Sequence, residues 1–427
     1  MSGLTALAVI FVAYTLVASR LDRWWITAPM VFVAAGAILG PAGLGIVPFS
    51  LSSETMRTIT ELTLTLLLFA DASTVRLSDV RDDARMPGRL LFIGLPLTVL
   101  AGTLLAHYLL PGVDWALAAL VATILAPTDA ALGMAVVTNR AVPARIRRAL
   151  NVESGLNDGI VTPVVTLFVA VAAAQEGIGD RAWGLEALKQ IGLAIVAAIV
   201  VGYGGGKLLA LARDRGWTGQ VSQQIAILAL ALLAYEGSVA IGGNGFVAAF
   251  AGGLLFGAAT RGSLATQGEF TDTVGLSASF LVWSIFGALF VGELFTRGIS
   301  ARPIFYAAAS LTVIRMVPVA ISLIGLRLRG ATLAFMGWFG PRGLASVVFT
   351  LIALDEFERS GAGATLVEVA TWTILLSVVL HGISATPLAA RYGASMAKAA
   401  DVPELAPADE PRIRLRAITA VTGLQRP

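Results

Sequence analysis

The stretch Asn151-Val152-Glu153-Ser154-Gly155-Leu156-Asn157-Asp158-Gly159-Ile160 places two carboxylates, a hydroxyl and an amide within apolar sequence. Ionisable residues inside a hydrophobic span are costly and usually mark a functional site. On a helix, residues i and i+4 lie above one another, so Glu153 and Asn157 share one face and Ser154 and Asp158 the adjoining one. The alternative is a helix N-terminus at a membrane surface, where the helix dipole favours acids. More than a turn of sequence precedes Glu153, which disfavours that alternative.

The composition is that of a polytopic membrane protein. Hydrophobic residues make up 57% of the chain, charged residues only 13%, and the mean hydropathy is +0.82. The formal net charge is +3. We exclude nucleic-acid binding because the basic residues lie in short loops between apolar spans, where they set orientation. The chain has no cysteine and two histidines, which excludes disulfides, thiolate chemistry, iron–sulfur clusters and a histidine-rich metal site.

Apolar runs of about 17 to 25 residues indicate membrane-spanning helices. The chain contains thirteen candidates, at 3–19, 26–43, 57–74, 89–110, 114–138, 145–174, 184–212, 219–237, 241–260, 272–295, 302–326, 330–354 and 364–388. The first lacks the basic region and cleavage site of a signal peptide, so we interpret it as a retained span. The sequence therefore predicts an all-α integral membrane protein with thirteen transmembrane helices.

The charges between these spans alternate from one side to the other. The residues that follow odd-numbered spans are mostly basic, among them Arg20, Arg23, Arg140, Arg145, Arg147, Arg148, Arg213, Arg215, Arg327 and Arg329. The opposite side mixes fewer basic residues with Glu176, Glu293, Asp355 and Glu356. The positive-inside rule then predicts a multi-pass protein of the cell (inner) membrane, with its N-terminus outside and its C-terminus cytoplasmic.

Two predicted spans are interrupted at their middles. The fifth contains Ala126-Pro127-Thr128-Asp129-Ala130 and the twelfth contains Phe339-Gly340-Pro341-Arg342-Gly343. Non-helical backbone at that depth is tolerated only where it lines a cavity or is buried in protein. The breaks lie seven spans apart and so run in opposite directions. This spacing predicts crossed broken helices in an inverted repeat of spans one to six and eight to thirteen, joined by the seventh.

The charged residues at mid-span each need a partner. Asp129 could neutralise the positive ends of the half-helices and Arg342 the negative ends. For Arg342 such a structural role suffices, whereas for Asp129 dipole neutralisation and ion ligation both stay open. Arg315, in the eleventh span, requires a carboxylate, and Glu153 is the favoured candidate, by bidentate pairing. That pair either orients Glu153 for function or only ties two helices together.

Three weaker signals are interpreted structurally. His107 and His381 each stand alone, which favours packing roles. The glycines of 202–206, 242–245 and 252–253 favour close helix packing. Residues 392–427, with several prolines and mixed charges, predict a short cytoplasmic tail without a core.

Taken together, these motifs resemble the electroneutral branch of the monovalent cation/proton antiporter superfamily, the sodium/proton exchangers of the Asn-Asp type. The stretch from Asn151 to Gly159 is similar to the Glu-Ser…Asn-Asp-Gly signature of that branch. Thr128-Asp129, Arg315 and Gly340-Pro341-Arg342-Gly343 look like its other three marks, in the same order. The resemblance extends from the second span to the thirteenth. One departure is that Pro127 precedes Thr128, whereas in many relatives a proline follows the aspartate.

The resemblance implies a site that binds a cation and a proton in turn. Asp158 would be the carboxylate that alternates between them, and Ser154, Asp129 and the Thr128 backbone would complete the oxygen shell. Glu153 would contact the cation directly or through water. The supporting residues implied are Arg315, which would pin Glu153, Asn157, which would hold it in place, and Arg342.

The resemblance also implies a homodimer in a lipid bilayer and a division of the chain. Residues 1–74 and 218–297 would supply interface helices, 75–175 and 298–391 a mobile core transport bundle, 176–217 a linker helix and 392–427 the tail. No cofactor and no enzymatic activity are expected. No histidine or lysine is placed to activate Ser154, which argues against an intramembrane hydrolase.

The expected function is exchange of a monovalent cation, Na⁺ first, for H⁺ by alternating access, with a role in pH homeostasis. Carboxylate, hydroxyl and carbonyl oxygens suit a hard cation. Because Asn157 cannot titrate and Glu153 would be locked by Arg315, we expect a one-to-one, electroneutral exchange. The alternatives are a K⁺/H⁺ exchanger, a sodium-coupled organic-solute symporter and a channel.

Overall fold

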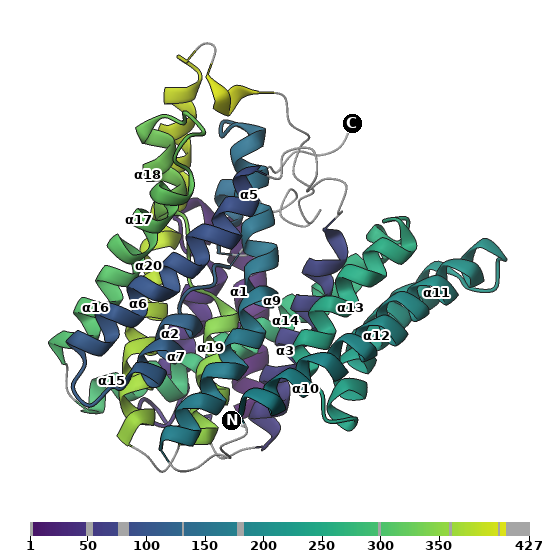
Figure 1. Ribbon diagram of the computed structural model, residues 1–427, viewed down its shortest axis with the longest axis horizontal. Coiled ribbons are helices and arrows are strands. Elements are labelled where there is room, and N and C mark those ends of the chain that lie inside the picture. The colour runs from purple at the N-terminus through teal and green to yellow at the C-terminus, as the bar shows by residue number, and fades with distance from the viewer. Residues whose placement is uncertain are drawn as a thin grey trace.

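The computed structural model describes residues 3–47, 54–75, 85–129, 132–176, 183–297, 300–357, 361–399 and 402–406. Within these ranges every regular element is a helix (Figure 1). By length and composition, eight of the described helices could cross a membrane, and three shorter helices are also apolar. The predicted all-helical membrane fold is confirmed. Ala130 of the first break and the tail beyond residue 406 lie outside the described residues.

One group of helices, called here the outer helices, comes from the two segments predicted as interface helices. They are α1 (Gly3–Arg23), α2 (Ala28–Leu39), α3 (Glu54–Thr74), α12 (Gln220–Ala240), α13 (Gly245–Thr260) and α14 (Ala265–Phe286), the last continued by the π-helical η3 (Gly287–Val291) and by α15 (Gly292–Arg297). Helix α13 packs on α3 because Gly253 and Gly257 lie against the backbone oxygens of Phe69 and Ser73, leaving no room for a Cβ.

A connecting segment links the two halves of the chain. It consists of α10 (Trp183–Ala197), the π-helical η2 (Ala198–Gly204) and α11 (Gly205–Asp214). Gly202 of η2 lies against the backbone of Gly252 in α13. The close packing predicted from the glycines is confirmed at this contact.

The second group is called here the core helices. It contains α5 (Arg85–Arg89), the π-helical η1 (Leu90–Gly94), α6 (Leu95–Leu109), α7 (Trp115–Ile124), α8 (Met134–Val137), α9 (Ala144–Gln175), α16 (Ala301–Leu311), α17 (Val313–Ser322), α18 (Gly330–Trp338), α19 (Leu344–Phe357) and α20 (Gly361–Met396). The fifth predicted span is broken between α7 and α8, and the twelfth between α18 and α19, as expected from the sequence. The eleventh is also broken, at Thr312, whose φ of −116° and ψ of −95° are not helical.

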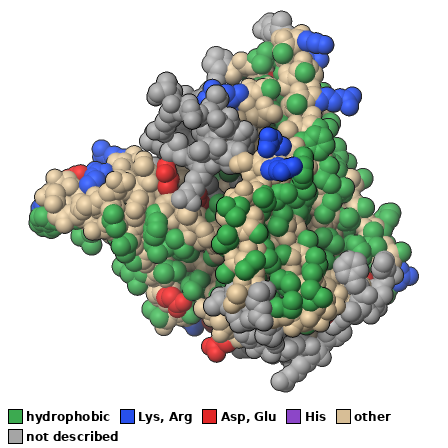
Figure 2. All heavy atoms as spheres, turned by 180° about the vertical axis from the view of Figure 1, so that it is seen from behind, with side chains coloured by type: hydrophobic (Ala, Val, Ile, Leu, Met, Phe, Trp, Pro, Cys, Tyr) green, Lys and Arg blue, Asp and Glu red, His purple; other side chains and the backbone are tan. Residues whose placement is uncertain are grey.

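The molecule has two ends, which we name by what they carry. The tail side carries the start of α18, the start of α9 and the C-terminal segment, at the top of Figure 1. The far side carries the start of α3 and the end of α19, which meet through Arg57 and Asp355. Figure 2 shows hydrophobic side chains over much of the face behind, with most of the Lys and Arg side chains in its upper part.

The described part of the segment predicted as a tail without a core is folded against the core helices. Helix α20 continues to Met396, and a 3₁₀ turn, η4 (Pro403–Leu405), docks on the tail side. The Glu404 carboxylate is 0% exposed and accepts hydrogen bonds from the Arg329 amide and the Thr332 hydroxyl, both 2.7 Å. Arg145 of α9 donates to the Pro403 carbonyl at 2.7 Å. The unpaired N–H groups at the start of α18 need an acceptor, and Glu404 supplies it.

Candidate functional site

The two helix breaks meet in the middle of the core. The Asp129 amide donates to the Pro341 carbonyl at 2.8 Å, which joins the breaks directly. The Asp129 carboxylate accepts from the Leu344 amide, at the start of α19, at 3.1 Å and from the Leu132 amide at 3.4 Å. Asp129 therefore neutralises the positive end of a half-helix, which is one of its two predicted roles.

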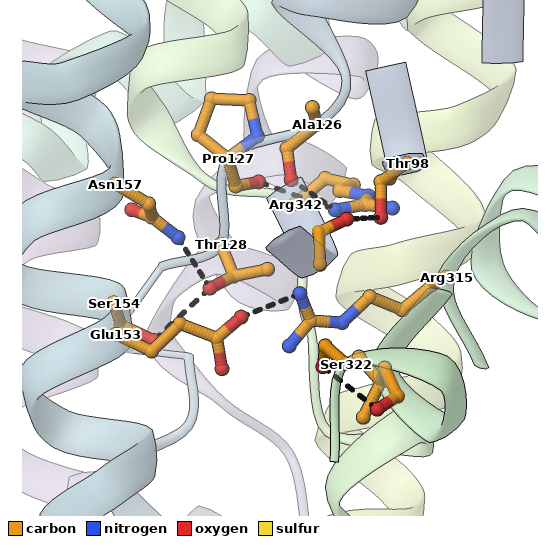
Figure 3. A network of polar contacts seen from close by, with 12 residues as sticks. Thr98, Ala126, Pro127, Thr128, Glu153, Ser154, Asn157, Arg315, Ser322 and Arg342 are labelled. Carbon is orange, nitrogen blue, oxygen red and sulfur yellow. Dashed lines mark hydrogen bonds and ion pairs between the residues drawn. The ribbon is translucent and has the colours of Figure 1, made fainter. Parts of the chain in front are cut away.

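Arg342 performs the opposite task at the end of α7. Its side chain is 0% exposed, and Nη1 donates to the Ala126 and Pro127 carbonyls at 2.6 and 3.4 Å (Figure 3). Nη2 donates to the Ser310 carbonyl at 3.2 Å. The Ala126 and Pro127 carbonyls lie where the interruption of the fifth span leaves carbonyls without helical partners, and the Ser310 carbonyl lies in the last turn of α16, beside the break at Thr312. The predicted structural role of Arg342 is confirmed.

The glycines of the second break make room for charged side chains. A Cβ on Gly343 would overlap the Asp129 carboxylate, and a Cβ on Gly340 would press against the Arg315 guanidinium and the Thr128 methyl group. The Gly-Pro-Arg-Gly pattern is thus explained by packing as well as by the broken helix. Only glycine permits both close approaches.

Glu153 of α9 and Arg315 of α17 form a buried ion pair. Arg315 Nη1 and Glu153 Oε1 lie 2.6 Å apart, and the two side chains are 2% and 3% exposed. The partner predicted for Arg315 is confirmed. The expected bidentate geometry is not: Glu153 Oε2 and Arg315 Nη2 have no hydrogen-bond partner among the described residues. A buried charge is costly unless an opposite charge lies beside it, so the Glu153 and Arg315 side chains stabilise each other in the core.

The Thr128 hydroxyl connects the first break to α9 through contacts with two side chains. It lies 3.1 Å from the Ser154 hydroxyl and accepts from Asn157 Nδ2 at 2.7 Å (Figure 3). The resemblance implied that Asn157 would hold Glu153, and the structure corrects this, because the amide is directed at Thr128 instead. Asn157 therefore fastens α9 to the first break.

Asp158 is placed differently from the other charged residues of the core. It lies on a partly exposed face of α9 with Asn151, Ser154 and Gly155. Its carboxylate accepts no hydrogen bond from the described residues, although the Thr162 hydroxyl donates to its main-chain carbonyl at 2.7 Å. Of the Glu153, Asp129 and Asp158 carboxylates near the crossing, only that of Asp158 has neither an ion pair nor a hydrogen bond from the described residues.

Two residues behind the second break were not predicted to support it. The Ser377 hydroxyl accepts from the Arg342 amide at 2.6 Å, and His381 Nε2 lies 2.9 Å from the Trp338 carbonyl at the end of α18. His381 is 1% exposed, and its Nδ1 contacts Ser377. The packing role predicted for His381 is confirmed. Its position opposite a helix end could have been anticipated only from tertiary structure.

The comparisons with known proteins agree with this arrangement. A family model described as "Sodium/hydrogen exchanger, transmembrane" matches residues 7–391. A protein named K(+)/H(+) antiporter NhaP2, from Shewanella sp. (strain ANA-3), is 26% identical over 90% of this chain. The K(+)/H(+) antiporter NhaP of Alkalimonas amylolytica is 25% identical over 90%. In both cases the chain spans 65% of the relative's length.

Two further matches extend the comparison. A protein named Na(+)/H(+) antiporter, from Schizosaccharomyces pombe, is 25% identical over 65% of each chain. The structure of the sodium proton antiporter MjNhaP1 from Methanocaldococcus jannaschii superimposes with a TM-score of 0.73, over 92% of this chain and 98% of that one, at 20% identity. At that identity the structural match establishes a shared fold.

Proposed function

The chain belongs to the sodium/hydrogen exchanger family, and from that premise we propose that it exchanges a monovalent cation for protons across the cell membrane. Asp158 binds the cation and the proton in turn, and movement of the core helices against the outer helices carries the site from one side to the other. The observation that carries this proposal is a contrast: the Asp158 carboxylate accepts no hydrogen bond from the described residues, whereas the charged side chains around it are paired or hydrogen-bonded.

The cation ligands are proposed from the oxygen atoms near Asp158. Ser154 lies one turn away on the same helix, and Thr128 is joined to Ser154 through their hydroxyl groups. Asp129 follows Thr128, and Glu153 contacts the cation directly or through water. Carboxylate, hydroxyl and carbonyl oxygens are the ligands that hard monovalent cations prefer.

The proposed stoichiometry is one proton for one cation. Glu153 is neutralised by Arg315, and Asn157 cannot titrate, so Asp158 alone changes its charge during the cycle. A proton and a monovalent cation neutralise it equally, and the loaded site therefore crosses the membrane without net charge. Competition between proton and cation for one carboxylate makes the exchange obligatory.

We propose Na⁺ as the first candidate cation. A second candidate, K⁺, is favoured by the names of the relatives that cover 90% of the chain. The proposed assembly is a homodimer through the outer helices, with thirteen spans and inverted repeats. The alternating charge of the loops supports an outer N-terminus and a cytoplasmic tail side.

The test uses purified protein in proteoliposomes that contain a pH-sensitive dye. Na⁺, Li⁺ and K⁺ gradients are imposed separately, each at several membrane potentials set by a separate ionophore. We expect cation-dependent proton movement whose rate does not follow the voltage. A rate that follows voltage would overturn the electroneutral stoichiometry, and an absence of cation-dependent proton movement would overturn the antiport itself.

A further inference from the structure

The outer helix α13 places an aromatic ring directly on the helix that carries Asp158. The Phe250 ring lies against the α9 backbone at Gly159, where an added Cβ would overlap the ring atoms. Phe250 is 9% exposed, and Gly159 is buried. Glycine at 159 is therefore needed because the ring approaches the helix axis closely.

One turn nearer the tail side, the same helix carries a second glycine with nothing against it. A Cβ added to Gly155 meets no atom within 4 Å. Asn151, Gly155 and Asp158 are all partly exposed, whereas Thr162, further along the same face, is 1% exposed. Asp158 thus lies on the tail side of the Phe250 ring, on a part of α9 that is partly exposed.

Beyond the ring, the outer and core helices are joined at three places on the far side. Asn244 Nδ2 donates to the Thr166 hydroxyl at 2.8 Å. The Phe246 and Phe349 rings meet edge to face at 6.4 Å, and Arg57 contacts Asp355 at 2.5 Å. These contacts hold the outer and core helices together on the far side of the Phe250 ring.

We propose that Phe250 is a positioning residue that decides which side of the membrane reaches Asp158, by occupying Gly159 in one conformation and Gly155 in the other. The inference rests on the proposed antiport. Two glycines four residues apart lie on one helix face, about 6 Å apart along the axis. A one-turn slide of one packed element past another is a known form of switching between two conformations.

The direction of the slide follows from the order of residues on α9. In the described conformation Asp158 lies on the tail side of the ring. When α9 moves toward the far side by one turn, Gly155 reaches the ring and Asp158 passes to its far side. The Asn244–Thr166 and Arg57–Asp355 contacts separate in the same movement, which opens the far side.

Cysteine cross-linking tests this directly, because the chain contains no cysteine of its own. Phe250→Cys is paired with Gly159→Cys, with Gly155→Cys and, as the control, with Asn151→Cys, one turn further along the same face. A disulfide requires Cα atoms within about 7 Å. We expect the 159 pair to form without ion gradients, the 155 pair to form at least about tenfold faster during exchange, and the 151 pair to stay at background. A 155 pair no faster than the 151 pair during exchange overturns the proposal.

A second variant separates a moving contact from a static one. In the described conformation Gly155→Ala is accommodated without contact, so its thermal stability should equal that of the parent. If the ring must occupy this position, exchange should fall by about tenfold, as overpacking raises the barrier. Adding Phe250→Leu to the Gly155→Ala variant should restore the exchange rate. The matched control is Gly192→Ala on α10, where an added Cβ also meets no atom within 4 Å. Parent-like exchange by Gly155→Ala would contradict the proposal, whereas a parent without exchange would contradict the antiport instead.

Discussion

Glu153 and Asp158 are carboxylates on the same helix, five residues apart, but they differ in burial and in their partners. Glu153 faces the crossing of the broken helices, where its Oε1 lies 2.6 Å from Arg315 Nη1 and both side chains are buried. Asp158 lies on a partly exposed face of α9, and its carboxylate accepts no hydrogen bond from the described residues. The difference teaches that charge alone does not identify the exchanging group: the group whose charge is not already neutralised by the protein is the one that can change partners.

The largest effect on exchange is expected from removing the charge of the Asp158 carboxylate. Asp158→Asn keeps the size and shape of the side chain but can bind neither a proton nor a cation, so cation-dependent proton movement in proteoliposomes should fall to background. Because the structure gives the Asp158 carboxylate no hydrogen-bond role, the melting temperature of the purified variant should stay unchanged. Sustained exchange would place the site elsewhere.

Removing one member of the buried pair should affect stability first. Arg315→Met leaves Glu153 buried without its cation, which typically costs about 3–5 kcal/mol in the free energy of unfolding. The double variant Glu153→Leu, Arg315→Met removes both charges and should recover most of that loss. Thermal unfolding in detergent measures both.

Exchange by the double variant then separates the two roles left open for the pair. If Glu153 contributes to the cation site, as we propose, the stable double variant will show a raised KM for the cation. An unchanged KM would mean that the Glu153–Arg315 ion pair only holds α9 and α17 together.

Asp129 lies between these two extremes, because it is bonded to the start of α19 and is also a proposed ligand. Asp129→Ala should lower the free energy of unfolding by about 1 kcal/mol, as expected for the loss of a helix cap, and Asp129→Asn should lower it by less. Both should raise the KM for the cation, because both remove a charged ligand. If Asp129→Asn retains the parent KM, Asp129 acts on the helix end alone.

The smallest effect on stability is expected from substitution of Glu404, which lies far from the crossing of the broken helices. Burial raises the pKa of Glu404, but hydrogen bonds from the Arg329 amide and the Thr332 hydroxyl outweigh it and lower the pKa below its ordinary value. The carboxylate therefore stabilises the folded protein fully above the ordinary glutamate pKa of about 4.3, and the contribution is lost as pH falls through the lowered value.

Glu404→Gln should accordingly lower stability by about 0.3–1 kcal/mol, the usual contribution of a charge at a helix N-terminus. The difference from the parent should be constant across neutral pH and vanish in acid. Unfolding measured over a pH series checks this. A difference that grows toward acid pH would assign the effect to another group.

Much of the site could be predicted because buried charges and broken helices have few physical solutions. Arg315 needed a carboxylate, and Glu153 was the candidate in the right span. Asp129 and Arg342 were matched to helix ends by sign alone. In each case an unpaired charge in the membrane is so unfavourable that few partners could satisfy it.

What could not be predicted depends on contacts between distant segments that follow no pattern. The turn of Asn157 toward Thr128 was missed because residues four apart on a helix also suit a contact with Glu153. The break at Thr312 has no proline or glycine to signal it. Glu404 lies in a short polar stretch whose composition resembles that of an unstructured tail, and only the position of α18 gives it a partner.

The Glu404 contact also bears on the order in which the protein is made. Pro403 and Glu404 are synthesised after the helices that they contact: Pro403 accepts from Arg145 of α9, and Glu404 caps the first turn of α18. During translation the start of α18 therefore waits without its acceptor until α20 has left the ribosome. The last described residues therefore complete the hydrogen bonds at the tail side of the core only after α20 has been synthesised.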